Sequence, residues 1–515
     1  MTSRTKRTRH LVRVAALLMV LAGWFAAPRV FRHWLEPMAL AAPMTFVVNT
    51  AADADDGLCS TAASGCTLRE AINAANANSG PDTVNFNIPG SGVRTIHLAS
   101  NLPFITSPVT IDGYTQGMAT PNTLAVGDNA LLLIELDVSA VSKAGCCIAD
   151  GLAIVGGNST VKGLVINRFN SSGIRLIGSG NNVIEGNFIG TDPTGATALG
   201  FNSGVSINSS NNTIGGTTAA ARNVLSGNTF GVQIGSSSAT GNQVQNNYVG
   251  TNASGTGPVS NSFGVLILGA TGNTIGGTLS TQSNLIAFNE NLGVSLGQNA
   301  LNNAILGNSI HSNIGLGIDF GSDGVTPNDL GDGDTGPNKL QNFPVLTKAQ
   351  DAAFVTTVQG ILNSTANTQF RIEFFSSPSC DDSGNGEGKK FVGFTNVITD
   401  ASGNAPLSVN IASASFDGPY LTATATDPAN NTSEFSNCVT ALGFSYTVNS
   451  AADTDDGSCT FAAGGCTLRE AINAANSNPE ANGIKFDIPG SGVRTISLLS
   501  ALPIITTPVV IDGYT

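Results

Sequence analysis

An internal repeat between residues 156 and 320 constrains the fold of this chain more than any other feature of its sequence. Three segments of eleven residues align, NNVIEGNFIGT, GNQVQNNYVGT and NNAILGNSIHS, and they begin at Asn181, Gly241 and Asn302. A second pair, NNTIGGT and GNTIGGT, lies between them. Self-similarity of this kind is typical of solenoids and propellers, in which each repeat buries its apolar face only against its neighbours.

Each repeat alternates apolar and polar residues over four or five positions and then turns at Gly or Asn. This period predicts strands, and it disfavours leucine-rich, ankyrin and similar helical repeats. The stretch has few aromatic residues, which disfavours propeller blades. We therefore expect a parallel β-helix, whose strands stack coil on coil about 4.8 Å apart. Asn187, Asn247 and Asn308 occupy equivalent turns, and we interpret them as a structural ladder of amides instead of a ligand site.

Residues 1–42 are interpreted as an export signal. Five basic residues precede an apolar run over 14–27, and Ala39 and Ala41 offer a small-residue cleavage site. The apolar run is short for a membrane span, so we expect a secreted or cell-surface protein with no stable span after cleavage. An uncleaved anchor is the alternative, because Arg29 and Arg32 interrupt the segment.

The mature chain is acidic and rich in small residues. Without residues 1–42 it has 15 basic and 34 acidic residues, a net charge of −19. This charge disfavours nucleic acid and anionic membrane surfaces as partners, and it is compatible with Ca²⁺. The 61 glycines and plentiful aliphatic residues fit β-solenoids and sandwiches, and they do not fit disorder.

Eight cysteines fall into pairs along the chain. An even number in an exported chain predicts disulfides, and the absence of a histidine near any pair disfavours zinc. We expect bonds within the pairs Cys59 and Cys66, Cys380 and Cys438, and Cys459 and Cys466. Cys146 and Cys147 are adjacent, and their pairing stays open.

A short helix is predicted soon after the export signal. Thr67 and Glu70 form a capping box, and Leu68, Ala71, Ile72 and Ala75 share one apolar face. Such a helix can cover the open end of a β-helix, whose apolar core and free strand edges otherwise invite aggregation.

The segment CTLREAINAAN, which begins at Cys66 and follows an Asp-rich turn, resembles the CSLREA domain of exported bacterial and archaeal proteins. Thr67 stands where the family name has Ser. The segment LPFITSPVTIDGYTQ, over 102–116, resembles the first coil that commonly follows this domain. The resemblance to right-handed parallel β-helix proteins of the pectin-lyase type continues to about Leu346. The resemblance implies an architecture and export. It does not imply a particular activity, because the family has no established general activity.

The N-terminal unit occurs twice, since residues 446–515 align with 46–115 without a gap. Because the second copy ends where the first enters its solenoid, we interpret the sequence as a truncated tandem array.

Residues 343–442 contain short alternating strands and are interpreted as an immunoglobulin-like sandwich that serves as a spacer; a carbohydrate-binding module is the alternative.

The chain is thus predicted to be all-β, a right-handed parallel β-helix capped by a short amphipathic helix and followed by a sandwich and a second cap. The expected segments are an export signal at 1–42, a cap and first coil at 43–115, the β-helix at 116–342, the sandwich at 343–442 and a truncated second cap at 443–515.

The repeats do not reveal a catalytic centre. A glycosidase needs two carboxylates about 5–10 Å apart, and a lyase needs a base together with a cation or similar neutralising group. From 156 to 317 the acidic residues are Glu185, Asp192 and Glu290. No catalytic residue is predicted; were the protein an enzyme, Asp319, Asp323 and Glu185 would be the candidates. His311 is interpreted as a surface residue.

One acidic loop follows the repeats. Carboxylates on a Gly-rich loop are ligands that Ca²⁺ prefers, although the spacing is not that of an EF-hand. We expect a structural Ca²⁺ site, with a solvated turn as the alternative; the Asp-rich turns that begin at Asp53 and Asp453 are weaker candidates. The expected ligands are Asp319, Asp323, Asp329, Asp332 and Asp334.

The functional prediction is an exported, modular and non-catalytic surface protein with an adhesive or envelope-structural role. Its expected partners are extracellular polysaccharides or cell-envelope components. A polysaccharide lyase or glycoside hydrolase is the first alternative, and a carbohydrate-binding protein without turnover is the second.

Overall fold

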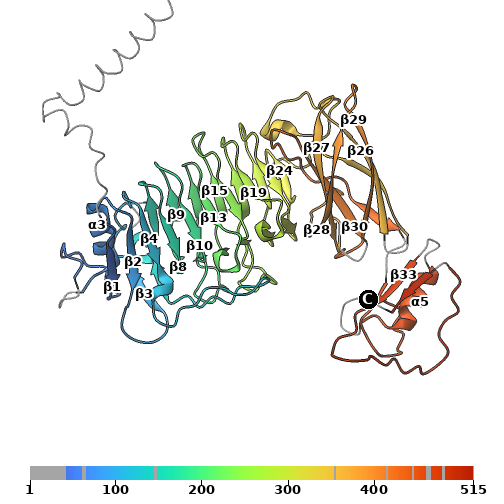
Figure 1. The fold of residues 1–515 in the computed structure, drawn as a ribbon, viewed down its shortest axis with the longest axis horizontal. Coiled ribbons are helices and arrows are strands. Elements are labelled where there is room, and N and C mark those ends of the chain that lie inside the picture. The colour runs from blue at the N-terminus through green and yellow to red at the C-terminus, as the bar shows by residue number, and fades with distance from the viewer. Residues whose placement is uncertain are drawn as a thin grey trace, which may run out of the picture. The chain divides into compact units, whose positions relative to one another are not determined.

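The computed structural model consists of a β-helix, a β-sandwich and the start of a second β-helix (Figure 1). The predicted export signal, apart from its last residue, and the pair Cys146 and Cys147 lie outside the described residues. The structure describes residues 42–60, 65–143, 148–352, 355–412, 416–442, 446–459, 465–477, 482–507 and 509–513.

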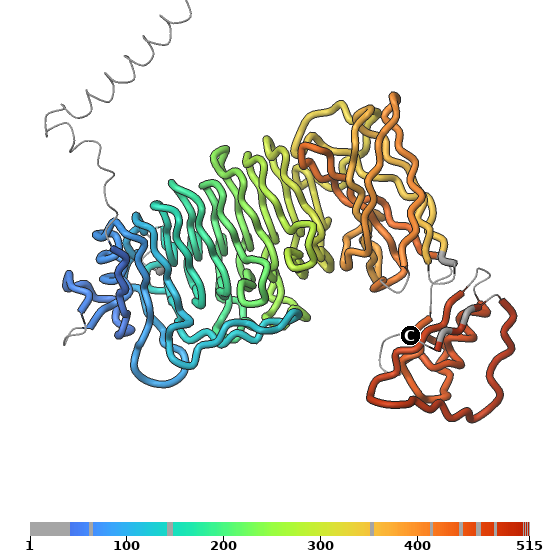
Figure 2. Tube along the Cα trace, viewed as in Figure 1, coloured from blue at the N-terminus to red at the C-terminus, as the bar shows by residue number. Residues whose placement is uncertain are grey.

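Three parallel sheets, which we call A, B and C, form the β-helix, and this confirms the predicted fold class. Successive coils stack in chain order (Figure 2). Sheet A contains β1 (Thr45–Val48), β2 (Asp82–Phe86), β4 (Val109–Asp112), β7 (Thr160–Lys162), β10 (Val183–Glu185), β13 (Thr213–Gly215), β16 (Gln243–Gln245), β19 (Thr274–Gly276) and β22 (Ala304–Leu306). Sheet B contains β3 (Arg94–His97), β5 (Ile134–Asp137), β8 (Leu164–Asn167), β11 (Phe188–Ile189), β14 (Val224–Leu225), β17 (Tyr248–Val249), β20 (Leu285–Ala287) and β23 (Ser309–His311). Sheet C contains β6 (Leu152–Ile154), β9 (Ser172–Leu176), β12 (Ser203–Ile207), β15 (Phe230–Ile234), β18 (Phe263–Ile267), β21 (Val294–Leu296) and β24 (Ile318–Phe320).

Short helices accompany these strands. They are α3 (Leu68–Ala77), α4 (Ser139–Lys143) and the 3-10 turns η1 (Gly113–Thr115), η2 (Ala219–Ala221), η3 (Ser280–Gln282) and η4 (Pro337–Leu340).

Stacked aliphatic side chains fill the interior of the β-helix. In sheet A, Ile184 pairs in register with Ile214, Ile214 with Val244, and Val244 with Ile275, and all four are fully buried. Each such side chain contributes roughly 1.5–3 kcal/mol relative to its exposed state. The alternation that predicted strands therefore arises because every second residue must point into this column.

Three ladders of buried asparagine run along the β-helix, one before sheet A, one between A and B, and one between B and C. In the ladder between A and B, the Asn247 Nδ2 donates to the Asn284 Oδ1 at 3.0 Å, and the Asn247 backbone N–H donates to the same oxygen at 2.9 Å. The members of this ladder are Asn187, Asn223, Asn247, Asn284 and Asn308. The other ladders comprise Asn182, Asn212, Asn242, Asn273 and Asn303, and Asn228, Asn261, Asn289 and Asn313.

The N-terminal helix α3 covers the first coil and is tied to it by its own motif. The Glu70 carboxylate accepts from the Thr67 backbone N–H at 2.8 Å and from the Asp56 N–H at 2.9 Å. The Arg69 guanidinium donates to both oxygens of Asp53. It also donates to the backbone carbonyls of Ser100 and Asn101. The Arg and Glu of the motif thus clasp the Asp-rich turn to the first coil.

The carboxylates of the Asp-rich turn are engaged by protein donors. Besides Arg69, Asp53 accepts from the Ala99 N–H at 2.7 Å, and Asp55 accepts from the Gly57 N–H and from the Asn73 amide. These bonds give the turn a structural role, and nothing in them points to Ca²⁺.

The second copy repeats this arrangement. Arg469 donates to both oxygens of Asp453, and Cys459 and Cys466 are bonded as Cys59 and Cys66 are. Its elements are β32 (Tyr446–Val448), α5 (Leu468–Ser477), β33 (Asn482–Phe486) and β34 (Val509–Asp512).

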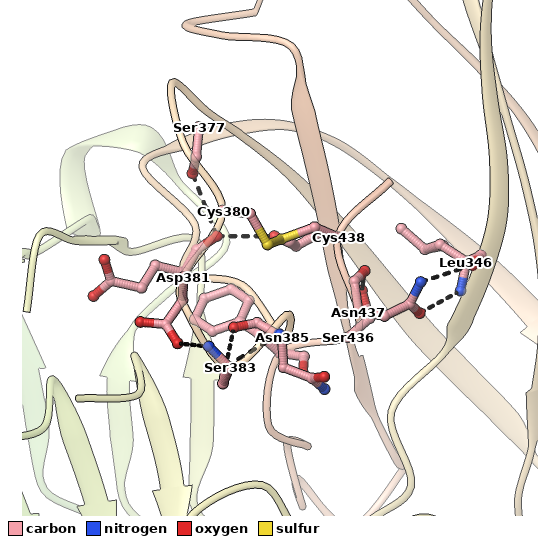
Figure 3. The surroundings of a disulfide bond; sticks show 12 residues. Leu346, Ser377, Cys380, Asp381, Ser383, Asn385, Ser436, Asn437 and Cys438 are labelled. Atoms are coloured by element: carbon pink, nitrogen blue, oxygen red, sulfur yellow. Dashed lines mark hydrogen bonds between the residues drawn. A yellow bond between two sulfur atoms is a disulfide. The ribbon is translucent and has the colours of Figure 1, made fainter. Parts of the chain in front are cut away.

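Seven strands form the sandwich, and a disulfide joins Cys380 to Cys438 within it (Figure 3). All three predicted disulfides are therefore confirmed. Beside this bond, the Asn437 side-chain amide pairs with both backbone groups of Leu346, at 3.0 and 2.9 Å, as a strand would. The strands are β25 (Val345–Ala352), β26 (Val355–Asn363), β27 (Gln369–Ser377), β28 (Lys390–Ile398), β29 (Asn404–Ala412), β30 (Tyr420–Thr426) and β31 (Val439–Leu442).

The sandwich closes the C-terminal end of the solenoid, a role that the spacer interpretation did not include. Phe375 and Phe435 of the sandwich belong to the same buried apolar cluster as the coils. The free amides of the last coil find acceptors in three sandwich carboxylates. Glu373 accepts from the Gly307 N–H, Glu387 from the Asn313 N–H and amide, and Glu434 from the Phe320 and Thr326 N–H groups, all at 2.8–3.0 Å.

Burial changes the acidity of these three carboxyls. Desolvation outweighs the hydrogen bonds that favour the charged form, so the pKa of Glu373 is raised. For the same reason the pKa of Glu387 and that of Glu434 each rise to about 7. The charged neighbours of these two groups, Asp381 and Asp319 respectively, raise the pKa further.

We predict that removing one amide from a ladder destabilises the β-helix. Asn247→Ala deletes the donor to the Ile214 carbonyl and the acceptor of the Asn223 amide, both buried. Each unsatisfied group costs about 1–3 kcal/mol, so the free energy of unfolding should fall by at least about 2 kcal/mol in denaturant titrations. Asn291→Ala, at an exposed position, is the control and should change it by less than about 0.5 kcal/mol. Equal losses in the two variants would contradict the ladder's role.

The junction carboxyls predict a loss of stability as the pH rises. Their pKa is raised on folding, so the native state holds more protons, and the stabilisation is complete below the unfolded pKa and lost as the pH passes about 7. Between about pH 5 and about pH 8, the stability of the wild type relative to the Glu387→Gln/Glu434→Gln double variant should fall by about 2–3 kcal/mol for each carboxyl. Thermal unfolding across this range measures it, and a difference that stays flat or increases would refute the assignment.

Candidate functional site

The acidic loop between β24 and β25 brings three of its five predicted ligands together. Carboxylate oxygens of Asp329, Asp332 and Asp334 lie within 4.8 Å of one another. Asp332 accepts from the Asn342 N–H at 2.9 Å and the Ser364 hydroxyl at 2.6 Å. The Oδ1 atoms of Asp329 and Asp334 are buried without a hydrogen-bond partner in the described part of the chain.

Electrostatics in this loop favour a cation. Desolvation, together with the neighbouring carboxylates, raises the pKa of Asp332 and that of Asp334. A bound cation would reverse this effect, and carboxylate oxygens of this number suit Ca²⁺ with additional ligands. The residues therefore fit a divalent cation.

Asp319 and Asp323 do not join the cluster. Asp319 lies on β24, where its Oδ2 accepts from the Gly324 N–H at 3.2 Å, and desolvation raises its pKa. Asp323 is exposed. Of the five predicted ligands, Asp319 and Asp323 therefore lie outside the group of carboxylates that come within 4.8 Å of one another.

The three residues named for a possible enzyme do not form one centre. Glu185 lies on β10 of sheet A, and Asp319 lies on β24, the last strand of sheet C. Glu185 is paired in register with Lys162, whose ammonium lies 3.2 Å from Asp112. Burial outweighs the attraction of Lys162 and raises the pKa of Glu185.

A charged cluster that sequence reasoning missed lies on the first coils of sheet B, and we call it the Glu135–Asp137 cluster. The Arg168 guanidinium lies 3.4 Å from Glu135 and 3.4 Å from Asp137, and His97 lies 3.3 Å from Asp137. Glu135 also accepts from the Thr95 hydroxyl at 2.7 Å. Desolvation raises the pKa of Asp137, but hydrogen bonds from Ser139 and the charges of Arg168 and His97 outweigh it, and the pKa is lowered.

The signal for this cluster was present in the sequence Ile134-Glu135-Leu136-Asp137. Alternate residues of a strand share one face, so the two carboxylates project together, roughly 6–7 Å apart along the strand. This separation lies within the range of paired carboxylates in glycosidases. Both groups are paired with Arg168, so neither carboxylate is free in this structure.

A second missed pair lies at the start of sheet C. Arg175 binds Asp150 at 2.6 Å, and its guanidinium lies 5.9 Å from the Phe104 ring centre. These residues line a pocket of about 630 Å³. Arg168 and Arg175 thus both belong to ion pairs on the first coils.

The outward faces of the later coils carry neutral side chains. In sheet C, Ser206, Gln233, Leu266 and Ser295 stand in register on successive strands. The Ser203 hydroxyl donates to the Gln233 side chain at 2.9 Å. Charge on the solenoid is thus concentrated in the first coils and at the junction with the sandwich.

The compartment is indicated by the covalent structure. Three disulfides are typical of proteins in oxidising environments outside the cytosol. Within the described ranges, we find no helix with the length and apolarity needed to cross a membrane.

Comparisons with known proteins returned matches only among solved structures, since neither protein-family models nor curated proteins matched. One match is a mutant of the periplasmic alginate epimerase AlgG, at 14% identity and a TM-score of 0.26, covering 47% of this chain and 64% of that chain. Another is the tailspike protein gp49 from Acinetobacter baumannii bacteriophage Fri1, a capsular polysaccharide depolymerase, at 12% identity and a TM-score of 0.17. This match covers 65% of this chain and 64% of that chain. A third is the enzymatically active domain of tailspike protein 2 of bacteriophage CBA120, at 10% identity and a TM-score of 0.19, covering 72% of this chain and 73% of that chain. The chain thus spans about 64% of the epimerase, and at these TM-scores the matches add nothing to the fold described above.

We propose that Asp329, Asp332 and Asp334 hold Ca²⁺ and predict that the ion stabilises the chain. At free Ca²⁺ about 100-fold above its dissociation constant, the stabilisation should be about 2.7 kcal/mol. Calorimetric titration and thermal unfolding measure it. Asp334→Asn should remove most of the effect, whereas Asp323→Asn, outside the cluster, should leave it. No heat and no change in melting temperature would exclude the site.

Proposed function

We propose that this chain is an exported, modular β-helix protein with a non-catalytic role in adhesion or envelope structure. The observation that carries the proposal is that both ends of the solenoid are sealed. Helix α3 covers the first coil, and the sandwich supplies acceptors to the last coil. A solenoid closed in this way is a self-contained rigid unit, as a display scaffold requires.

The second cap supports the same proposal. The Arg469–Asp453 clasp repeats the Arg69–Asp53 clasp with the same partners and nearly the same distances. A chain that begins a new cap directly after a sandwich is organised as a series of units. The CSLREA-type motif and export by residues 1–42 are part of this proposal, and the disulfides are in keeping with export.

Polysaccharide or cell-envelope material is the proposed partner. Thr213, Gln243 and Thr274 in sheet A, together with Ser206 and Gln233 in sheet C, offer donors and acceptors at the spacing of stacked strands, about 4.8 Å. Such rows are neutral, so they can bond to sugar hydroxyls without the cost of desolvating a charge.

A polysaccharide-acting enzyme is the second candidate, and the Glu135–Asp137 cluster is the observation that favours it. It places two carboxylates, a histidine and an arginine on one face. A carbohydrate-binding protein without turnover differs from the main proposal only in having a defined ligand site.

We predict that the purified chain is retained on polysaccharide without cutting it. Acidic and neutral polysaccharides are immobilised with and without Ca²⁺, and both retention and newly formed reducing or unsaturated ends are recorded. Retention without new ends is the expected result. New ends would overturn the non-catalytic proposal, and their loss in Glu135→Gln and Asp137→Asn, but not in the exposed control Glu290→Gln, would assign the activity to the cluster.

A further inference from the structure

A pocket at the junction of the solenoid and the sandwich combines residues of both. Its volume is about 520 Å³. Phe288, His311 and Ser312 line it from the last coils, and Ser377, Glu387 and Lys389 line it from the sandwich. Ligand pockets occur preferentially at such module interfaces and contain a few polar groups beside an apolar surface.

The two modules are fixed to each other at this pocket. Ile310 and Gly388 exchange two backbone hydrogen bonds, at 2.9 and 2.8 Å, and the Asn313 amide donates to Glu387 at 2.8 Å. The Lys389 N–H donates to the Ser377 hydroxyl at 3.1 Å. The walls of the pocket are therefore held in place before any ligand arrives, which lowers the entropic cost of binding.

Several polar atoms of the pocket retain unused hydrogen-bonding capacity. The Lys389 ammonium has one carboxylate partner, Asp417 at 2.6 Å, and can donate further bonds. The Nδ1 of His311 is bonded to the Ser312 hydroxyl at 3.0 Å, and no described residue bonds to its Nε2. His311, which the sequence analysis placed on the surface, is thus a pocket residue.

The two charged side chains that line the pocket are engaged by protein partners, Glu387 by Asn313 and Lys389 by Asp417. Desolvation and the nearby Lys389, against the weaker opposite effect of Asp417, lower the pKa of His311 to about 4, so its ring is neutral at physiological pH. The Phe288 ring packs edge-to-face on His311, with centroids 5.8 Å apart, and provides an apolar surface. Lys389 is balanced by Asp417.

We infer that this junction pocket binds a neutral sugar residue of an extracellular glycan. Sugar hydroxyls both donate and accept, which matches Lys389, His311 and Ser312, and the C–H face of a sugar ring suits the Phe288 ring. A uronate would need an unpaired cation, which the Lys389–Asp417 pair does not offer. This inference rests on the proposed function and extends it, because it makes the sandwich part of the ligand site.

Equilibrium binding of the full chain to fluorescently labelled oligosaccharides, neutral and uronate-containing, tests the inference. We expect a neutral oligosaccharide to bind, and Lys389→Ala and Phe288→Leu each to weaken it about tenfold. Lys390→Ala, at the adjacent exposed lysine that does not line the pocket, and Phe230→Leu, on sheet C, are the matched controls and should bind as the wild type does.

Three outcomes would overturn the inference: no neutral oligosaccharide binds, only uronate-containing ones bind, or binding survives in both pocket variants. Thermal unfolding of each variant shows whether a loss of binding reflects a loss of folding. Retention of the pocket variants on immobilised polysaccharide separates the two proposals. If the wild type is retained on polysaccharide but binds no soluble oligosaccharide, the junction site is wrong and the scaffold proposal stands. If the wild type is not retained on polysaccharide either, the proposed polysaccharide partner is also wrong.

Discussion

The backbone amides at the ends of a stack of parallel strands need acceptors, and most of this structure follows from that requirement. Along the solenoid each coil is satisfied by the next, and the asparagine ladders extend the same pairing into the turns. At the last coil no further coil is available, and the carboxylates of Glu373, Glu387 and Glu434, together with the Gly388 backbone, take its place. An unpaired buried amide costs about as much as a lost hydrogen bond, so these acceptors are as much part of the solenoid as its own coils.

The same requirement explains why buried carboxyls occur at the junction. A carboxylate accepts several N–H groups at once, which a hydroxyl or an amide oxygen does less well. The consequence is a group that is hydrogen-bonded and yet poorly solvated, and its pKa rises towards neutrality. Strong edge capping and sensitivity to pH are therefore two results of one choice of residue.

The sequence allowed the solenoid to be predicted because stacking makes its pattern periodic. Asn187, Asn247 and Asn308 were recognised since their coils have nearly the same length and sequence. Asn223 and Asn284 escaped notice because their coils differ, although each also precedes a variable residue and an aliphatic one. The Glu135–Asp137 cluster was missed for a related reason: the long insertions around β5 break the period, so the pairing of β3, β5 and β8 is not visible in the sequence. The junction was beyond sequence reasoning altogether, since Glu434 and Phe320 are 114 residues apart and share no pattern.

The disulfide of the sandwich has a consequence for a chain that is pulled. Cys380 and Cys438 are separated by 58 residues, a length that would extend by roughly 200 Å if it were released. The segment that covers the last coil, which includes Glu434 and Phe435, lies inside this closed loop. Under tension this loop cannot lengthen, so the pulling force acts on the chain outside the loop and not on the covering segment. A sandwich forced open would therefore keep Glu434 and Phe435 within a closed loop, which shortens the search by which they return to the last coil.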